Sequence, residues 1–346
     1  MRSGDFALLS PDDGRLWQGR GPFAAAAAPR SGGWSFYVTD FFGRDLHPWK
    51  IPAQGQESES AASSPSSESL AVEWTPLFCG PFAEHFLELQ GIIRRGELRK
   101  GVPLVFETGR VAEAAALWEQ ATKRCAQLPP ALRAYAWREA GDGFFGATPE
   151  LLFRAHREGS RWRVRTMALA GTAPVGRGEE LLCDAKELHE HGLVVEDLLR
   201  ELRAFGKVER GPTEVHRLPA LEHLRTDIEV VLSIDAPPGR LFQDLVRALH
   251  PTAALGAAPR GERARRWMTE VDAGVERRSF GAPFGAISPE GEMVCLVAIR
   301  QVQLQADGAL RVGSGCGVVE QSRWHKEWRE LELKRDSVKS LFGLGK

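Results

Sequence analysis

The chain has 346 residues, of which 43% are hydrophobic and 26% are charged, and its formal net charge is −1. This length allows one large domain or two fused lobes, and the composition is that of a globular protein with an ample core. A nearly neutral chain offers no basic field to a phosphate backbone, which argues against nucleic-acid binding. The five cysteines contain no Cys-x-x-Cys pair, which excludes a disulfide framework and a structural zinc site by spacing.

The N-terminal sequence "MRSGDFALLSPDDGRLW" lacks the basic start and the apolar run of a signal peptide. No uncharged apolar run reaches about 18 residues, the length that a membrane-spanning helix requires. We therefore expect a cytoplasmic protein with no membrane span, and the scattered cysteines agree with a reducing compartment.

Residues 1–79 predict a strand-rich segment that is part of the same fold as the rest of the chain. Aromatic, strand-like stretches broken by Gly and Pro occupy residues 21–43. The Ser- and Glu-rich residues 53–69 predict a flexible loop, because they bury too little apolar surface to offset their ordering entropy.

Helix and strand signals alternate over residues 80–346. Helical periodicity is present in residues 82–98, 111–128, 179–206 and 241–251, and in a closing helix around 327–334. Strand patterns occupy residues 101–107, 133–175, 214–233 and 280–319, with turns at "AGDG" and "REGS". Strand groups interleaved with long helices predict an α+β fold with antiparallel sheets rather than a doubly wound parallel sheet.

Several carboxylates stand at positions that suggest a site. The stretch "EWRELELK" places Glu327, Glu330 and Lys334 on one face of a helix, because they are three and four residues apart. The same spacing also fits a surface helix with intrahelical ion pairs. Glu190 lies in a helix with an apolar face and fits either a buried carboxylate or a solvated charge. Glu150 follows a proline ahead of an apolar strand, where a lone carboxylate is more often exposed than catalytic.

The Gly-rich stretch "GSGCGVV" (313–319) has the spacing Gly-x-Gly-x-Gly, and the residues after it do not open a helix. It therefore does not fit the dinucleotide-binding fingerprint. A turn whose backbone N–H groups approach a small anion fits it better.

Nine blocks, in this order, resemble the chorismate-utilising enzyme family over roughly residues 80–343. They are "GATPELLFR", "ALAGTAPVG", "KELHEHGLVVEDL", "HRLPALEHLRTDI", "LFQDLVRALHPTAALG", "FGAPFGAIS", "LVAIR", "GSGCGVV" and "EWRELELK". The family includes isochorismate, salicylate, anthranilate and aminodeoxychorismate synthases. The resemblance implies one large α+β domain, with antiparallel sheets and flanking helices around a central active site, and a catalytic region over residues 80–346. It also implies chorismate, a dicarboxylate, as the substrate.

The resemblance further implies a Mg²⁺ site. The family's metal-binding glutamates fall on Glu190 and Glu330, with Glu327 as a nearby ligand. Oxygen ligands that leave room for several waters suit Mg²⁺, whose remaining position would take the substrate carboxylate.

Five other positions match the family's substrate-binding residues. Lys334 resembles the substrate-side lysine, Arg300 the carboxylate-binding arginine, and Gly315 the glycine whose amide contacts that carboxylate. Thr172 in "AGT" and His250 in "HPT" match further pocket positions.

The residue that heads the strand "GVPLVFE" separates the branches of the family. The isochorismate and salicylate branches carry a lysine there and the ammonia-using branches carry glutamine; this chain has Lys100. The resemblance thus implies Lys100 as the base that activates water for attack at C2 of chorismate. It implies Glu150 as the acid that protonates the departing C4 hydroxyl, a role that requires a raised carboxyl pKa.

The segment "RRSFGAPFG" (277–285) departs from the family's usual pattern, since Arg278 replaces a glycine and Phe280 a tyrosine. We predict a Mg²⁺-dependent isochorismate synthase of menaquinone, siderophore or secondary-metabolite biosynthesis, acting as a monomer without a glutaminase subunit. The alternatives are a salicylate synthase, an anthranilate or aminodeoxychorismate synthase component I, and a non-catalytic chorismate-binding protein. An unrelated helical interaction module would leave the ordered blocks unexplained.

Overall fold

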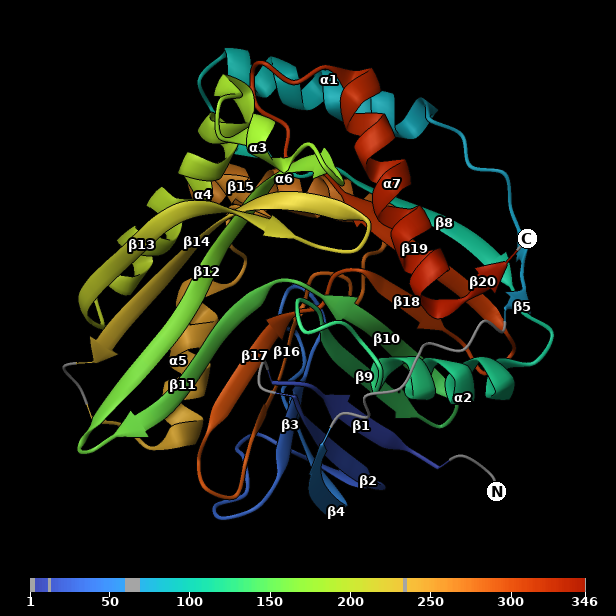
Figure 1. Ribbon diagram of the computed structural model, residues 1–346, viewed down its shortest axis with the longest axis vertical. Helices are drawn as coiled ribbons and strands as arrows, with labels where there is room; N and C mark the ends of the chain where they lie inside the picture. The colour runs from blue at the N-terminus through green and yellow to red at the C-terminus, as the bar shows by residue number, and fades with distance from the viewer. Residues whose placement is uncertain (1–3, 12–13, 60–68, 233–234, 346) are drawn as a thin grey trace.

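Figure 1 shows the computed structural model, which describes residues 4–11, 14–59, 69–232 and 235–345. The helices in these ranges are α1 (Gly80–Arg94), α2 (Ala114–Cys125), α3 (Gly178–Leu181), α4 (Ala185–Leu202), α5 (Pro238–Leu249), α6 (Glu262–Val275) and α7 (Trp324–Phe342). The strands of the first half are β1 (Phe6–Leu9), β2 (Arg15–Ala26), β3 (Ser35–Val38), β4 (Trp49–Glu59), β5 (Leu70–Ala71), β6 (Glu73–Trp74), β7 (Lys100–Gly101), β8 (Leu104–Arg110), β9 (Arg133–Glu139), β10 (Asp142–Thr148), β11 (Leu151–Glu158) and β12 (Arg161–Pro174). Those of the second half are β13 (Gly206–Arg217), β14 (Leu221–Leu232), β15 (Ala257–Ala258), β16 (Pro283–Ile287), β17 (Met293–Val297), β18 (Gln301–Leu304), β19 (Ala309–Gly315) and β20 (Leu344–Gly345).

One 16-stranded sheet dominates the fold, in the order β13-β14-β12-β11-β17-β16-β3-β4-β2-β1-β9-β10-β18-β19-β8-β6. Its strands pair antiparallel, as the sequence predicts. The N-terminal strands lie in the middle of the sheet and join its two halves. On one side β3 pairs with β16, with Phe36 opposite Ala286, and on the other β1 pairs with β9, with Leu8 opposite Ala136. The predicted α+β fold with antiparallel strands is confirmed.

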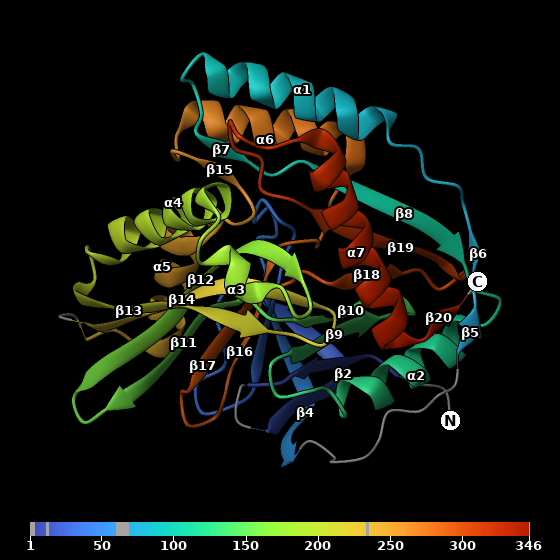
Figure 2. The same cartoon turned by 45° about the horizontal axis from the view of Figure 1, so that its top comes forward.

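Two helices from distant parts of the chain flank the region where the predicted site residues gather. Helix α4 packs on β12, and α7 packs on β19. In Figures 1 and 2, α7 runs down the face of β18 and β19, and Figure 2 shows α1 and α6 side by side near the first turns of α7. Each flanking helix thus rests on its own half of the sheet.

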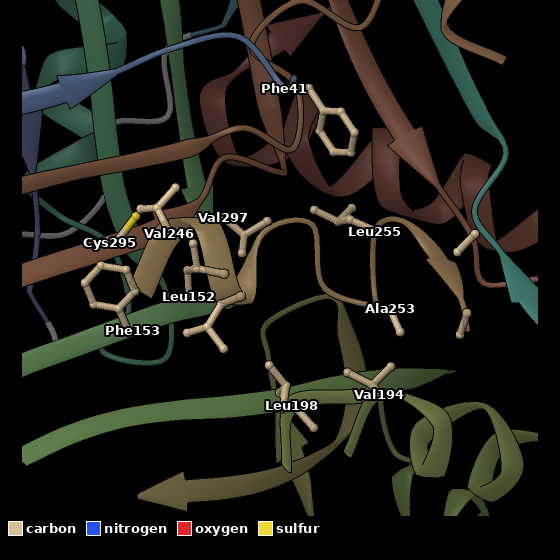
Figure 3. Packing of buried hydrophobic residues seen from close by; sticks show 14 of the residues in the cluster. Phe41, Leu152, Phe153, Val194, Leu198, Val246, Ala253, Leu255, Cys295 and Val297 are labelled. Atoms are coloured by element: carbon tan, nitrogen blue, oxygen red, sulfur yellow. The ribbon is translucent and has the colours of Figure 1, made fainter. Parts of the chain in front are cut away.

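A large cluster of buried side chains holds α4 and α5 against the sheet. Figure 3 shows Val194 and Leu198 of α4 next to Ala253, with Leu255 further along the segment that follows α5. Burying a Val or Leu side chain contributes about 1.5–3 kcal/mol, so this layer fixes the helix that carries Glu190.

The helix predicted over residues 179–206 is wrong in its bounds, because the structure divides it into α3 and α4. Helix α3 ends at Leu181, and Asp184 caps α4, its carboxylate accepting from the backbone N–H groups of Lys186 (2.9 Å) and Glu187 (3.2 Å). Helix α4 ends at Leu202, and Gly206 already begins β13.

Two further regions differ from the sequence-based expectation. The predicted loop over 53–69 begins as strand, because β4 continues to Glu59 and pairs with β2 as far as Arg15; residues 60–68 lie outside the described residues. Helix α6 was not expected, although it buries Ala264, Trp267, Met268 and Val271 at helical spacing. None of the helices in the described ranges is long and apolar enough to cross a membrane.

Candidate active site

Two adjoining hollows lie between α4, α7 and the ends of β12 and β19. The inner pocket has a volume of about 60 Å³, and its lining includes Glu150, Thr172, Glu190, Arg300, Gly315, Glu330 and Lys334. The outer vestibule, of about 740 Å³, shares Thr172 and Glu330 with it and is also lined by Lys186, Glu187 and Glu327. The structure therefore brings together predicted site residues that are up to 184 positions apart in the sequence.

Lys100 is fully buried at the start of β7 beside the inner pocket. Its Nζ lies 3.1 Å from Oε1 of Glu190. This contact is an ion pair without the direction of a good hydrogen bond, so no described group satisfies the ammonium as a hydrogen-bond acceptor. A buried ammonium with open donor positions is available to a ligand or to water in the pocket.

Glu150 lies at the turn between β10 and β11 and is 4% exposed. Burial raises the pKa of its carboxyl to about 7, although the positive charges of Lys100 and Lys334 and a 3.5 Å hydrogen bond from Thr252 act in the opposite direction. Near neutral pH this carboxyl therefore exists in both protonated and ionised forms, as a general acid requires.

Arg300 is held by neutral partners on both sides. It donates to Oγ of Ser337 (2.6 Å), and its Nη2 lies 3.2 Å from Nε2 of His223. The carbonyl of Gly171 can only accept, and it lies 2.9 Å from Nδ1 of His223, so the imidazole carries its proton on Nδ1 and accepts from Arg300 at Nε2. Burial, followed by the charges of Arg300 and Lys334, lowers the pKa of His223 well below its usual value.

The backbone at Arg300 is itself unusual, with a left-handed φ of 54° between β17 and β18. Non-glycine residues adopt this conformation at a cost and often do so at functional sites. Burial lowers the pKa of the guanidinium to about 10, with the charge of Glu330 opposing this, so Arg300 remains charged at neutral pH. No carboxylate is paired with it at salt-bridge distance in the described residues, which leaves it free to bind an anion.

A cluster of four glutamates stands at the boundary between the pocket and the vestibule: Glu187 and Glu190 of α4, and Glu327 and Glu330 of α7. The ammonium of Lys186 lies among three of them, 3.0 Å from Glu187, 3.0 Å from Glu190 and 3.2 Å from Glu327. Glu330 instead lies 2.6 Å from Nζ of Lys334 and accepts from the hydroxyl of Thr172 at 3.1 Å.

The carboxylates in this cluster have different proton affinities. Burial would raise the pKa of Glu190, but Lys186 and Lys100 outweigh it and lower the pKa to about 2. Burial raises the pKa of Glu327 to about 7; Lys186 opposes this, and the neighbouring Glu330 adds to it. The cluster therefore combines a carboxylate that is ionised at neutral pH with one that readily holds a proton.

The donor set fits Mg²⁺, which prefers carboxylate oxygens and retained waters. Glu187, Glu190 and Glu327 already direct oxygens toward one cation, the ammonium of Lys186. Across the described ranges, no three or more His, Cys, Asp and Glu side chains already stand at metal-ligand spacing. The carboxylates would therefore have to close in around a metal ion.

Glycine is required at position 317, next to this cluster. A Cβ there would collide with the carboxylate of Glu190 and would lie 2.6 Å from Cε of Lys100. The last glycine of "GSGCG" thus lets the backbone pass close to the Lys100–Glu190 pair. Gly315 lies at the end of β19, and its carbonyl accepts from Lys334 at 2.8 Å.

The structure does not bring His250 into the inner pocket. Its Nε2 lies 2.7 Å from the carbonyl of Phe41, and the nearby positions that do line the pocket are Ala254 and Leu255. Sequence reasoning missed Lys186, Glu187 and His223. The pair Glu187–Glu190 repeats the three-residue spacing of Glu327–Glu330, a signal that could have identified Glu187.

Comparisons with known proteins agree with this arrangement. The sequence matches the family described as "Chorismate binding enzyme" over residues 60–343. It is 36% identical over 224 residues to "Salicylate biosynthesis isochorismate synthase" of Pseudomonas aeruginosa, covering 61% of this chain and 45% of that protein. It is 33% identical over 210 residues to "Isochorismate synthase MenF" of Pasteurella multocida, covering 57% and 46%. The matches thus span about half the length of these relatives.

A solved structure has a similar fold over nearly the whole chain. It is that of MenF, the menaquinone-specific isochorismate synthase from Escherichia coli, with a TM-score of 0.78 and 20% sequence identity, covering 99% of this chain and 89% of that chain. At this identity the likeness concerns the fold alone. With a family match over more than four fifths of its sequence, the chain belongs to the family of chorismate-binding enzymes.

Proposed function

We propose that the protein is a Mg²⁺-dependent isochorismate synthase, which converts chorismate to isochorismate. The observation that carries this proposal is the pair Lys100 and Glu150, a fully buried lysine side chain and a buried carboxyl with a pKa of about 7 beside the same pocket. The named relatives from Pseudomonas aeruginosa and Pasteurella multocida support the same reaction.

The two groups supply the two proton transfers of the reaction. Lys100 acts as the base that takes a proton from water as the oxygen attacks C2 of chorismate. The ring double bonds shift, the bond between C4 and its hydroxyl breaks, and Glu150 gives its proton to the departing oxygen to form water. One water is consumed and one is released, so the product is an isomer of the substrate.

Arg300 and Lys334 bind and orient the two carboxylates of chorismate in this proposal. Arg300 has a planar donor group suited to a carboxylate, and His223 and Ser337 hold it without neutralising it. Glu190, Glu327 and Glu330, with Glu187, would hold Mg²⁺. The bound ion would neutralise and orient a substrate carboxylate.

One wall of the inner pocket is apolar. It consists of Ala254, Leu255, Phe280 and Ile299, and none of these side chains carries an acidic or basic group. Phe280 in particular has no hydroxyl where the family usually has tyrosine. Both release of isochorismate and further elimination of pyruvate are compatible with this wall, and we propose release because the named relatives are isochorismate synthases.

Water as the nucleophile requires no ammonia and no glutaminase subunit, and we propose that the protein acts as a cytoplasmic monomer without one. Its product would enter menaquinone, siderophore or secondary-metabolite biosynthesis; the names of two similar proteins refer to menaquinone and to salicylate biosynthesis.

Product analysis tests the proposal. The purified protein is incubated with chorismate and Mg²⁺ without ammonia, and the products are identified by liquid chromatography and mass spectrometry. We expect isochorismate without pyruvate. Salicylate with an equal amount of pyruvate would establish the salicylate synthase reaction instead, and turnover only with ammonia would establish an aminating synthase. Chorismate binding without turnover would show a non-catalytic binding protein.

A further inference from the structure

Lys186 occupies a position that helix energetics alone does not favour. It stands in the first turn of α4, where the positive end of the helix dipole disfavours a cation. Its pairing with Glu190 also has the less favourable order, with the lysine N-terminal to the glutamate. Its location must therefore be explained by the groups around its ammonium.

Those groups are carboxylates from two helices. Glu187 and Glu190 belong to α4 and Glu327 to α7, and each has an oxygen 3.0–3.2 Å from Nζ of Lys186. A Mg²⁺ ion among the same oxygens would lie about 2.0–2.1 Å from its ligands. An ammonium and a metal ion cannot both be at the centre of these three carboxylates, because two cations would then share one small space.

We propose that Lys186 is a built-in exchangeable cation, whose ammonium neutralises the carboxylate cluster when no metal is bound and leaves when Mg²⁺ enters. This inference rests on the proposed metal site. It assigns to Lys186 the role of a positioning residue, which keeps Glu187, Glu190 and Glu327 together in the metal-free protein and lowers the affinity for the ion.

The structure provides a place for the ammonium to go. Lys186 lines the outer vestibule, which has a volume of about 740 Å³. Its four-carbon chain can rotate toward Glu180 and Asp184, which line the same vestibule. The exchange therefore needs a change of side-chain rotamer and no movement of α4.

Calorimetric titration of Mg²⁺ into metal-stripped, substrate-free protein tests the exchange. Lys186→Gln removes the competing charge, so we expect it to bind Mg²⁺ about tenfold or more tightly than the unchanged protein. Lys186→Arg, which keeps the charge, should retain the weak binding. A matched control is Lys123→Gln on α2, which removes an exposed lysine 2.8 Å from Glu119 and should leave the affinity unchanged. Equal or weaker binding by Lys186→Gln would refute the exchange.

A second measurement uses the unchanged protein and does not depend on how the variants fold. An amine-acylating reagent is applied with and without Mg²⁺, and modification of each lysine is quantified by mass spectrometry. We expect Mg²⁺ to increase the labelling of Lys186 several-fold and to leave Lys123, whose side chain is 63% exposed, unchanged. Unchanged labelling of Lys186 at saturating Mg²⁺ would overturn the proposal.

These results are separable from those on the proposed function. A protein that forms isochorismate but shows neither the affinity change nor the labelling change retains the proposed function and loses the cation exchange. A protein that shows both changes and no turnover has the exchange without the proposed reaction. If neither the unchanged protein nor its variants bind Mg²⁺, both the metal site and the exchange are refuted.

Discussion

Burial acts to raise the pKa of Glu150, Glu190 and Glu327 alike, and the neighbouring charges decide whether each pKa ends above or below its usual value. Glu190 has two ammonium groups within 3.1 Å and its pKa falls to about 2. Glu150 has positive charges only at longer range, and its pKa rises to about 7. Environments that separate the pKa values of neighbouring carboxyls are typical of sites with distinct acid and metal-binding roles.

The proposed acid role of Glu150 predicts a pH profile. Because its folded-state pKa is raised, the protonated form is lost as pH rises through about 7, and turnover should decline above that pH. Glu150→Gln should lower kcat by about 10²–10⁴-fold while chorismate still binds. A Glu150→Gln enzyme with an unchanged rate and pH profile would remove Glu150 from the mechanism.

The same group should affect stability. Folding raises the pKa of the Glu150 carboxyl from 4.5 to about 7, so the folded protein holds this proton more tightly than the unfolded chain does. The resulting contribution to the free energy of unfolding is fully present below pH 4.5 and is lost as the pH rises through about 7. We expect Glu150→Gln to raise the free energy of unfolding by about 2–3 kcal/mol at pH 8 and to change it little at pH 4. Urea denaturation at the two pH values measures both.

Lys100→Ala tests the base. Turnover should fall by about 10²–10⁴-fold with chorismate binding largely retained, because Arg300 and Lys334 remain. The neighbouring exposed residue Arg99, whose ion pair with Glu196 lies at the surface, provides the matched control Arg99→Ala, which should keep the full rate. Retained turnover by Lys100→Ala would place the base on another residue.

At the scale of elements, two helices hold the carboxylate cluster. Each contributes two glutamates three residues apart, and each is fixed by packing on its own half of the sheet. The first turn of α4 positions part of this cluster, because Lys186 and Glu187 are its second and third residues. The carboxylate of Asp184 accepts hydrogen bonds from the backbone N–H groups of both.

Removing this cap should loosen the first turn of α4. Asp184→Ala should lower the free energy of unfolding by about 1 kcal/mol, whereas Asp184→Asn, which keeps an accepting oxygen, should lower it much less. Thermal or urea denaturation of the two variants makes the comparison. Equal losses in both would attribute the effect to the charge of Asp184 and not to capping.

At the scale of the whole molecule, most helices and strands were predictable from local patterns, with α6 missed and the boundary between α3 and α4 misplaced. The site was predictable only through ordered motifs. Glu190 or Glu330 alone fits a solvated helix charge; the blocks around them placed both in one pocket. His223 was missed because alternation along β14 gives a buried histidine no chemical signature. Lys186 was missed because a lysine at the start of a helix usually faces solvent. Its burial among carboxylates depends on α7, which lies 138 positions later in the sequence.

The position of β1–β4 in the centre of the sheet has a consequence for how the protein is made. These strands leave the ribosome before β16, and the edge of β3 stays uncovered until β16 follows about 250 residues later. Until then a nascent chain presents unpaired β-strand edges, which are a route to aggregation. Production of the protein should therefore depend on chaperones that shield the early strands, and the soluble yield should rise when translation is slowed by cooling.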